Sequence, residues 1–532
     1  MSAKRLLQTF DRVSNTPGAT SRLRRFVLDM AVRGLLVEQD SGDGDAAAIL
    51  EQATVPQLDR SRRTALSAEF PDLSEVPYEV PDSWVWCRLN QIGLIIGGGT
   101  PPSEDADNFT AGGSGIAWLT PADMAGQAEL EVQHGARDLT ERGLHSSSAT
   151  LMPKGTVLFT SRAPIGYVGV AAQDITTNQG FKSLVPSNAV DPRYAAIFFR
   201  AFAPAIDAAA PGTTFKEVSG KIVSRLPFPL PPLCEQQRIV ARVDELMALC
   251  DQLELAQRER ELQRGALRAA SLHRLTSGDP EADKTMDVRF FLDTSSRLFT
   301  NSDHVAPLRQ TLVDLAVNGL LGTHDPAEGA GSAGWITAEL RGLLSRLQTG
   351  PFGTALHKSD YVLGGTPVVN PASMIDGRIV PSPKMTIGPR TLDRLSSFKM
   401  RENDIVMARR GEMGRCAVVT AVEEGWLCGT GSLLLRFPST ISAHFLALLI
   451  GSPSVRQYLG GSAVGSTMQN LNQSILLSLQ VNLPPLPEQQ RIVARVQELM
   501  TLCQQLEIAL ESSQEERARL LEALLHESLV NS

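Results

Sequence analysis

A segment of 25 residues occurs twice in this chain of 532 residues, and this duplication is the strongest constraint on its fold. The first copy runs from Leu230 to Glu254 and the second from Leu483 to Glu507, and the two agree at 21 of 25 positions. Both read Leu-Pro-Pro-Leu, then one variable residue, then Glu-Gln-Gln-Arg-Ile-Val-Ala-Arg-Val. The fold must therefore use one element at two places.

Each copy has the features of a long helix. Proline is tolerated in a first turn that needs no N–H donor, and Glu235 or Glu488 follows where the helix dipole favours a carboxylate. Apolar residues then alternate spacings of four and three, namely Ile239, Val243, Leu246, Cys250 and Leu253, and Ile492, Val496, Leu499, Cys503 and Leu506. This period is typical of helices that pack on helices, so we expect the two seams to face each other. A helix from Cys234 to about His273 would be about 60 Å long.

A second pair of related segments precedes the first. Leu23–Leu36 and Leu308–Leu321 agree at 8 of 14 positions, and in both a Gly suited to a helix end precedes the last two leucines. A helical pattern extends over Lys4–Val37. Each segment therefore predicts a helix that comes before a longer, variable region.

The variable regions have strand patterns. A Gly-rich turn at Gly97–Pro101 follows Trp84–Leu89, and Thr349–Pro351 follows Trp335–Leu340. Short apolar runs between Gly and Pro turns then predict strands. They are Gly115–Leu119, Thr156–Thr160, Tyr167–Ala171 and Ser183–Pro186, and in the second half Pro367–Val369, Asp404–Ala408, Cys416–Thr420 and Ser432–Phe437.

The repeats divide the chain into five segments. We expect a helical segment with a linker at 1–80, a variable domain at 81–230, a helical segment with a spacer at 231–332, a second variable domain at 333–482 and a final helical segment at 483–532. The predicted fold class is α+β: two mixed, strand-rich domains separated by long antiparallel, coiled-coil-like helices, with an internal pseudo-twofold duplication.

Composition narrows the class of protein. Apolar residues make up 42% of the chain, and its length exceeds that of one core. Six cysteines form no CxxC pair, and no apolar run is suited to a signal peptide or a membrane span. We therefore predict a cytoplasmic protein without a structural metal site.

Charge bears on the kind of partner. The net charge of −8 disfavours nucleic acid, since Lys and Arg supply most non-specific affinity for phosphates. Residues 334–482, however, hold 14 Lys and Arg against 9 Asp and Glu. A local basic domain is therefore compatible with DNA.

No catalytic motif was found, so we predict that the chain is not an enzyme. Gly220-Lys221-Ile222 lacks the upstream glycine and the hydroxyl residue of a phosphate loop. Asn370-Pro371-Ala372-Ser373 lacks the aromatic residue that DNA amino-methyltransferases use to hold a flipped base. We therefore predict no catalytic residues and no metal ligands.

Polar and basic residues around paired Gly turns are the candidates for DNA contact. Side chains of these types read base edges and bind phosphates, although an Arg beside a Gly turn is ordinarily a solvated charge and an Asn in a loop ordinarily caps a turn. The predicted DNA-binding residues are Thr100, Arg162, Asn178, Gln179, Lys182, Thr213, Thr214, Lys216, Lys358, Arg409, Arg410, Arg415, Ser466, Thr467, Gln469 and Asn470.

With these repeats and loops, the sequence resembles the specificity (S) subunit of type I restriction–modification systems. The resemblance rests on the Leu-Pro-Pro-Leu-x-Glu-Gln-Gln-Arg-Ile-Val segments, the Gly-Thr-Thr or Gly-Ser-Thr loops before them and the Leu23–Leu36 and Leu308–Leu321 segments. It implies that the variable domains are target recognition domains, each for one half of a bipartite double-stranded DNA site. It also implies that the helical repeats hold two methyltransferase (M) subunits, and restriction (R) subunits through them.

The resemblance further implies that this chain carries no cofactor, with S-adenosylmethionine, ATP and Mg in the partner subunits. Polar residues of the two repeats are the candidates for partner contact, namely Glu235, Gln236, Arg238, Arg242, Glu488, Gln489, Arg491 and Arg495. Two alternatives stay open: a solitary S-like scaffold, which would not co-purify with M subunits, and a self-sufficient methyltransferase, which would methylate DNA alone.

Overall fold

The computed structural model describes residues 16, 18–58, 71, 76–127, 129–211, 216–276, 290–291, 293–295, 297–321, 334–352, 355–461, 471 and 473–530. Its contacts divide the chain into two compact units. The first comprises residues 1–259 together with 516–532, and the second comprises 260–515. Each unit therefore joins one variable domain to parts of both long helices.

Besides the end of α16 (Leu486–Val530), the first unit contains seven α-helices and eleven strands among its described residues. The helices are α2 (Ala19–Val32), α3 (Ala46–Glu51), α4 (Leu89–Ile92), α5 (Glu141–His145), α6 (Pro192–Ala209), α7 (Gly220–Ser224) and the first part of α8 (Leu233–Thr276). The strands are β1 (Val85–Arg88), β2 (Gly93–Gly97), β3 (Phe109–Ala111), β4 (Ile116–Leu119), β5 (Glu131–Val132), β6 (Arg137–Leu139), β7 (Val157–Ser161), β8 (Ile165–Ala171), β9 (Thr176–Thr177), β10 (Lys182–Pro186) and β11 (Pro227–Leu230).

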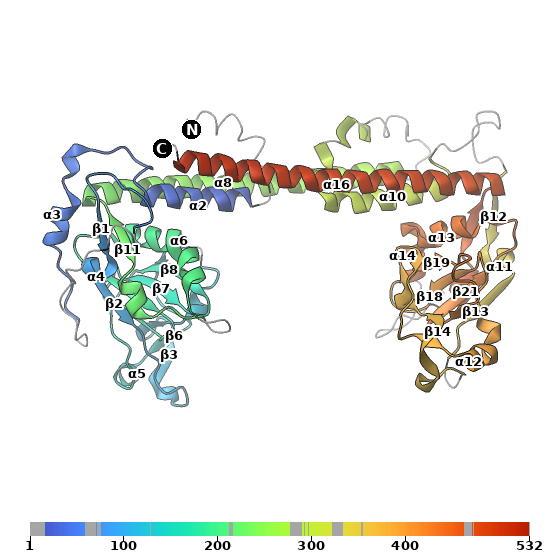
Figure 1. The fold of residues 1–532 in the computed structure, drawn as a ribbon, viewed down its shortest axis with the longest axis horizontal. Helices are drawn as coiled ribbons and strands as arrows, with labels where there is room; N and C mark the ends of the chain where they lie inside the picture. The colour runs from blue at the N-terminus through green and yellow to red at the C-terminus, as the bar shows by residue number, and fades with distance from the viewer. Residues whose placement is uncertain are drawn as a thin grey trace. The chain divides into compact units, whose positions relative to one another are not determined.

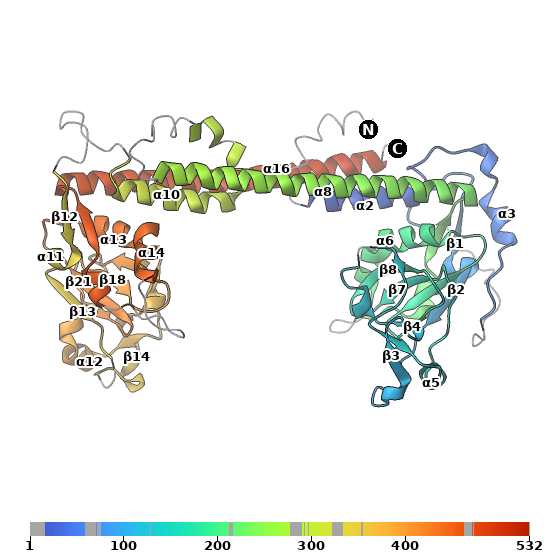
Figure 2. The ribbon, with the colours of Figure 1, turned by 180° about the vertical axis from the view of Figure 1, so that it is seen from behind.

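The first domain is built on a five-stranded sheet in the order β2-β10-β7-β8-β5, with a smaller sheet β3-β6-β4-β9 beside it. Helix α6 packs on the β7–β8 side, and its Phe198 and Phe199 are fully buried (Figure 1). From behind, Figure 2 shows β3, β4 and α5 at the end of the domain that lies away from α8. Strand β1 pairs with β11, so the start and the end of the domain meet beside the long helix.

The second unit repeats this plan. Its helices are α10 (Val305–Val317), α11 (Leu340–Leu343), α12 (Pro389–Arg394), α13 (Ala443–Gly451), α14 (Pro453–Gly461), α15 (Gln473–Leu477) and most of α16 (Leu486–Val530). Its strands are β12 (Ile336–Glu339), β13 (Arg346–Thr349), β14 (Tyr361–Val369), β15 (Met374–Ile375), β16 (Arg378–Ile379), β17 (Thr386–Ile387), β18 (Ile405–Ala408), β19 (Cys416–Val418), β20 (Leu427–Cys428), β21 (Ser432–Arg436) and β22 (Gln480–Leu483).

The two domains share the central part of their topology, although β5 and the β15–β16 pair have no counterpart in the other domain. The order β13-β21-β18-β19 matches β2-β10-β7-β8, and β12 pairs with β22 as β1 pairs with β11. The parallel pair β14–β20 matches the parallel pair β4–β9. The chain is therefore an α+β protein with an internal duplication, as its sequence predicts.

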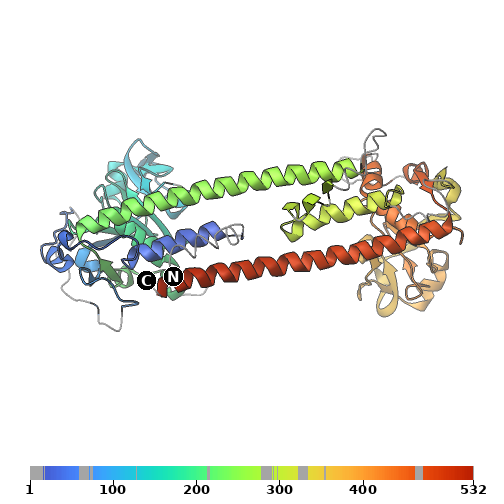
Figure 3. The same cartoon turned by 90° about the horizontal axis from the view of Figure 1, so that it is seen from above.

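Short helices α2 and α10 fill the same place in their units, each beside parts of α8 and α16 (Figure 3). Arg24 Nη1 lies 2.8 Å from Glu254 Oε2 on α8, and Ala19 shares a core with Leu521 and Leu525 on α16. In the second unit Arg309 Nη2 lies 2.7 Å from Glu507 Oε2 on α16. Each short helix therefore holds segments that are distant in sequence.

The expected packing of one seam on the other is wrong. Ile239 and Val243 enter the core of the first domain together with Ala31 of α2. Ile492 and Val496 enter the core of the second domain together with Val317 of α10. The seams have a helix-packing period because they meet the short helices, which the repeat pattern alone does not reveal.

The predicted elements otherwise lie close to the observed ones. The helix predicted to start near Cys234 is α8, and all eight predicted strands overlap strands of the structure. Of the helical pattern at Lys4–Val37, residues 4–15 and 17 lie outside the described residues. Within the described ranges, no helix has the length and apolar character needed to cross a membrane.

Candidate nucleic-acid interface

Gly98 in the first domain and Gly350 in the second make the same close backbone contact. A Cβ atom on Gly98 would lie 2.1 Å from the carbonyl oxygens of Thr177 and Asn178, and one on Gly350 would lie 2.0 Å from that of Gly429. Only glycine allows this approach. Both turns are therefore held against the segment that follows the parallel strand pair.

A pair of backbone hydrogen bonds lies beside each turn. In the first domain Ser161 N–H donates to Gly180 O at 2.8 Å, and Ser161 O accepts from Val218 N–H at 3.0 Å. In the second domain Arg409 N–H donates to Gly431 O at 2.8 Å, and Arg409 O accepts from Leu471 N–H at 3.0 Å. The next residues, Arg162 and Arg410, are therefore equivalent.

We call these segments the glycine-turn cluster of each domain. It comprises residues 98–100, 161–162, 178–182 and 217–218 in the first domain, and 349–352, 409–410, 429–432, 471 and 473 in the second.

In the first domain the cluster joins several predicted DNA-binding side chains. Thr100 Oγ1 donates to Gln179 Oε1, and Gln179 O accepts from Lys182 Nζ at 3.3 Å. Glu217 lies 3.6 Å from both Arg162 Nη1 and Lys182 Nζ. Glu217 therefore holds the two cationic side chains close to each other.

In the second domain the cluster has different side chains. Gln473 Nε2 donates to Thr349 Oγ1 at 2.7 Å, and Thr430 Oγ1 donates to Pro351 O at 2.7 Å. Arg410 is exposed and Arg409 is half-buried on the loop after β18. The backbone frame is thus shared, whereas the side chains that it presents are not.

Three other predicted residues lie outside this network or serve the fold. Asn178 Oδ1 accepts from Gly180 N–H at 2.8 Å, so the side chain caps its own turn. Lys216 Nζ lies 3.2 Å from Asp207 Oδ2, and Lys358 is exposed at the start of a short 3-10 helix, Lys358–Asp360. The predictions for Thr213, Thr214, Ser466, Thr467, Gln469 and Asn470 lie outside the described residues.

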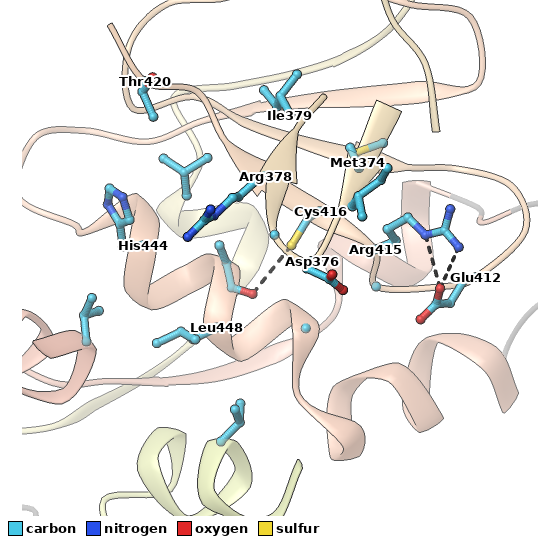
Figure 4. A pocket seen from close by; sticks show the side chains of 18 of the residues that line it. Met374, Asp376, Arg378, Ile379, Glu412, Arg415, Cys416, Thr420, His444 and Leu448 are labelled. Carbon is cyan, nitrogen blue, oxygen red and sulfur yellow. Dashed lines mark hydrogen bonds and ion pairs between the residues drawn. The ribbon is translucent and has the colours of Figure 1, made fainter. Parts of the chain in front are cut away.

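Arg415 lies on a cleft of about 890 Å³ in the second unit. Figure 4 shows its guanidinium directed at Glu412, whose Oε2 lies 2.7 Å from Arg415 Nη2. Arg456 Nη1 lies 2.6 Å from the other oxygen, Glu412 Oε1. The hydrogen bond from Arg415 lowers the pKa of Glu412, so the carboxylate stays charged and ties the loop between β18 and β19 to Arg456 of α14.

The duplicated helix signature has a structural role in both copies. Gln236 Oε1 accepts from Asp191 N–H at 2.7 Å, and its Nε2 donates to Ala189 O and Pro231 O at 2.9 Å each. In the second copy Gln489 Oε1 accepts from Ser442 N–H at 2.7 Å. Asp191 and Ser442 are the N-caps of α6 and α13. The glutamine therefore ties the main helix of the domain to the start of the long helix.

The preceding glutamate is also buried. Glu235 Oε2 accepts from Trp84 Nε1 at 2.9 Å, and Glu235 Oε1 accepts from Gln39 Nε2 at 2.6 Å. Burial raises the pKa of the Glu235 carboxyl, and both hydrogen bonds oppose this shift. Glu488 is 4% exposed, and its Oε2 accepts from Arg491 Nε at 2.7 Å.

These contacts correct part of the partner assignment. Glu235, Gln236, Glu488 and Gln489 are buried against their own domains, so their side chains do not face a partner. Arg238 Nη2 lies 2.6 Å from Asp43 Oδ2, and this pair lowers the pKa of Asp43. Of the predicted partner residues, Arg242 and Arg495 are exposed.

Comparison with known proteins agrees with this arrangement. The family described as "Type I restriction modification DNA specificity domain" matches residues 81–264 and 353–512. The chain belongs to this family. The function of type I specificity proteins is DNA sequence recognition within a restriction–modification system, and DNA and the methyltransferase and restriction subunits are the partners that membership implies.

Two relatives show how far the similarity extends. The chain is 23% identical to the EcoEI specificity subunit of Escherichia coli over 576 residues, which is 96% of this chain and 93% of that subunit. It is 34% identical to the MjaIX specificity subunit of Methanocaldococcus jannaschii over 163 residues, which is 30% of this chain and 37% of that subunit. Among solved structures, the HsdS subunit from Thermoanaerobacter tengcongensis is 19% identical with a TM-score of 0.44, covering 86% of this chain and 99% of that one.

In this type I specificity protein, three residues of the glycine-turn clusters were not predicted from the sequence. Glu217 is an anion among predicted cations, and Gln473 follows the predicted Gly-Ser-Thr loop by several positions. Phe352 is apolar, so it was not considered for DNA contact. Its signal was its place two residues after Gly350, as Thr100 stands two residues after Gly98. Among the residues that the structure describes, no group of His, Cys, Asp and Glu side chains is arranged to hold a metal ion.

Proposed function

We propose that this chain gives a type I restriction–modification complex its sequence specificity, with each domain reading one half of a bipartite DNA site. The observation that carries the proposal is the shared frame of the two glycine-turn clusters, which differ in the side chains that they present. Thr100 and Gln179 stand in the first domain where Phe352 and Thr430 stand in the second. One docking geometry with two sets of reading residues suits two different half-sites.

In this proposal the long helices set the distance between the half-sites. Helices α8 and α16 contain 44 and 45 residues. At 1.5 Å per residue each is about 66 Å long. A gap of unread base pairs between the half-sites follows from such rigid spacers.

The helices also present the surface for two methyltransferase subunits. Arg242, Glu245 and Leu249 share one exposed stripe of α8, because spacings of three and seven return to the same helix face. Arg495, Glu498 and Leu502 repeat this stripe on α16, and the two leucines are 52% and 56% exposed. No described core contains these residues, so two copies of one partner account for their identity.

The chemistry then belongs to the partners. The chain itself is proposed to be non-catalytic and to bind no cofactor, whereas S-adenosylmethionine would be bound by the M subunits and ATP and Mg by the R subunits. Its own residues would bind and orient the DNA.

Methylome sequencing of cells that express the complex tests the proposal. The expected result is one methylated motif with two defined halves and a fixed gap. Deleting Ala256–Leu262 and Ala509–Glu515 together shortens both helices by about 10 Å while nearly keeping the helical phase, so the gap should shrink by about 3 base pairs. The half-sites serve as the internal control and should not change. An unchanged gap in a folded, methylating complex would refute the spacer role.

A further inference from the structure

Phe352 is an aromatic side chain at a position where the first domain has a polar one. Gly98 and Gly350 are equivalent in their close contacts, and the residues two positions later are Thr100 and Phe352. Thr100 donates a hydrogen bond to Gln179, whereas the side chain of Phe352 is 70% exposed. A phenylalanine ring left in water forgoes most of the free energy that its burial would supply.

The backbone around Phe352 is held by several hydrogen bonds. Gly350 N–H donates to Ser432 O at 2.9 Å, and Pro351 O accepts from Thr430 Oγ1 at 2.7 Å. Phe352 O accepts from Ala355 N–H at 3.3 Å. A residue fixed in this way loses little conformational entropy when a ligand covers its ring.

The surroundings of Phe352 favour DNA as the ligand. The ring belongs to the same glycine-turn cluster as Arg409 and Arg410, and residues 334–482 carry five more basic than acidic residues. An apolar protein surface would not need this charge, whereas phosphates beside a base contact would attract it. DNA offers apolar surface to an aromatic ring at the faces of unstacked bases and at thymine methyl groups.

We propose that Phe352 reads the second half-site through an apolar contact with a base. This inference rests on the proposed function, and it adds that the two half-sites are read by different chemistry at equivalent positions. The first domain uses the Thr100 hydroxyl and the Gln179 amide, and the second uses the ring of Phe352.

The test uses the complete complex with its methyltransferase partners and the DNA motif that the wild-type complex methylates. Phe352→Ala should weaken binding to the wild-type site by about 5- to 150-fold. Phe352→Leu should retain part of this affinity. Because the loss comes from the second half-site, it should vanish on DNA whose second half is already scrambled, while discrimination at the first half is unchanged.

Val422→Ala is the matched control. Val422 is 73% exposed in the same domain but lies in a turn whose contacts are with Thr420, outside the glycine-turn cluster. Its binding should equal that of the wild type. Thr100→Ala should give the converse pattern, with a loss confined to the first half-site.

Two DNA probes distinguish the sources of the apolar contact. Replacing each thymine of the second half-site by uracil removes only the methyl group, so a methyl contact predicts that one replacement weakens the wild type but not Phe352→Ala. A contact with an unstacked base instead predicts that 2-aminopurine fluorescence rises on binding and that Phe352→Ala removes the rise. Either result supports the inference.

Other outcomes overturn it. Unchanged affinity and specificity of Phe352→Ala would overturn the inference alone, since the wild-type complex would still read its site. Equal weakening on every DNA sequence, or a loss of methyltransferase subunits from the complex, would also do so. A wild-type complex with no sequence preference would overturn the proposed function together with it.

Discussion

Replacing Gln236 by alanine should loosen the first domain from its long helix. The amide group is fully buried and makes hydrogen bonds with Asp191 N–H, Ala189 O and Pro231 O. Alanine would leave one donor and two acceptors without these partners. A buried unsatisfied group costs about 1–3 kcal/mol, and a water molecule in the vacated space would recover part of the loss. We therefore expect a destabilisation of about 3–5 kcal/mol.

Urea unfolding followed by hydrogen exchange measures this effect and locates it. Amides in the first turn of α6 should exchange faster in Gln236→Ala, because that turn is tied to α8 through Gln236. Gln237→Ala is the matched control, since this neighbouring glutamine is exposed. Gln489→Ala should act on the start of α13 in the second unit in the same way.

Equal stability and equal exchange for the Gln236→Ala and Gln237→Ala variants would refute the reasoning. So would a Gln236→Ala chain of wild-type stability that no longer co-purifies with its partners. In that case the buried hydrogen bonds would contribute little to the stability of the domain. The shared sequence of the two copies would then serve to bind a partner.

Three further predictions concern other contacts. Arg410→Ala should weaken recognition of one half-site by about 1–3 kcal/mol if it contacts a base, as competition binding with half-site variants would show, whereas equal weakening on all sequences would indicate a phosphate contact. Asp404→Ala should cost about 3–5 kcal/mol in urea unfolding, because Asp404 makes two hydrogen bonds of 2.7 and 2.6 Å with Arg436 in a buried site; no loss would contradict this. The raised pKa of Glu235 means that its protonated form favours the folded state, so this stabilisation is present below the unfolded pKa and is lost as pH rises through the folded pKa. As the pH rises above about 4, the wild type should therefore lose stability relative to Glu235→Gln in urea titrations, and parallel pH profiles would exclude the effect.

The repeats made the duplication, the long helices and most strands predictable from sequence. Apolar runs such as Val157–Ser161 become fully buried strands because each face of the strand meets a core. The partner of a seam was not predictable, since Ile239 has the same period whether it meets another long helix or α2. Period reveals which face of a helix is buried but not what buries it.

The candidate site was predictable in part. Arg162, Gln179 and Lys182 come together because two tight turns bring their segments to one edge. Gln236 looked like a surface residue because glutamine is usually exposed, and only three-dimensional packing shows its hydrogen bonds with distant backbone. Phe352 was missed for the opposite reason, because apolar residues are expected inside.

The contact between α2 and the end of α16 can form only after α16 has been synthesised. Arg22 Nη1 donates to Ala518 O across 496 residues, and Ala19 is 2% exposed in a core that it shares with Leu521 and Leu525. A ribosome makes α2 long before these leucines, at about 5–20 residues per second, so the apolar side of α2 stays open for roughly half a minute or more. During synthesis the first domain can form its sheets, but the apolar side of α2 is covered only when α16 is present. A nascent chain stalled within α16 would expose the apolar side of α2 to chaperones and proteases.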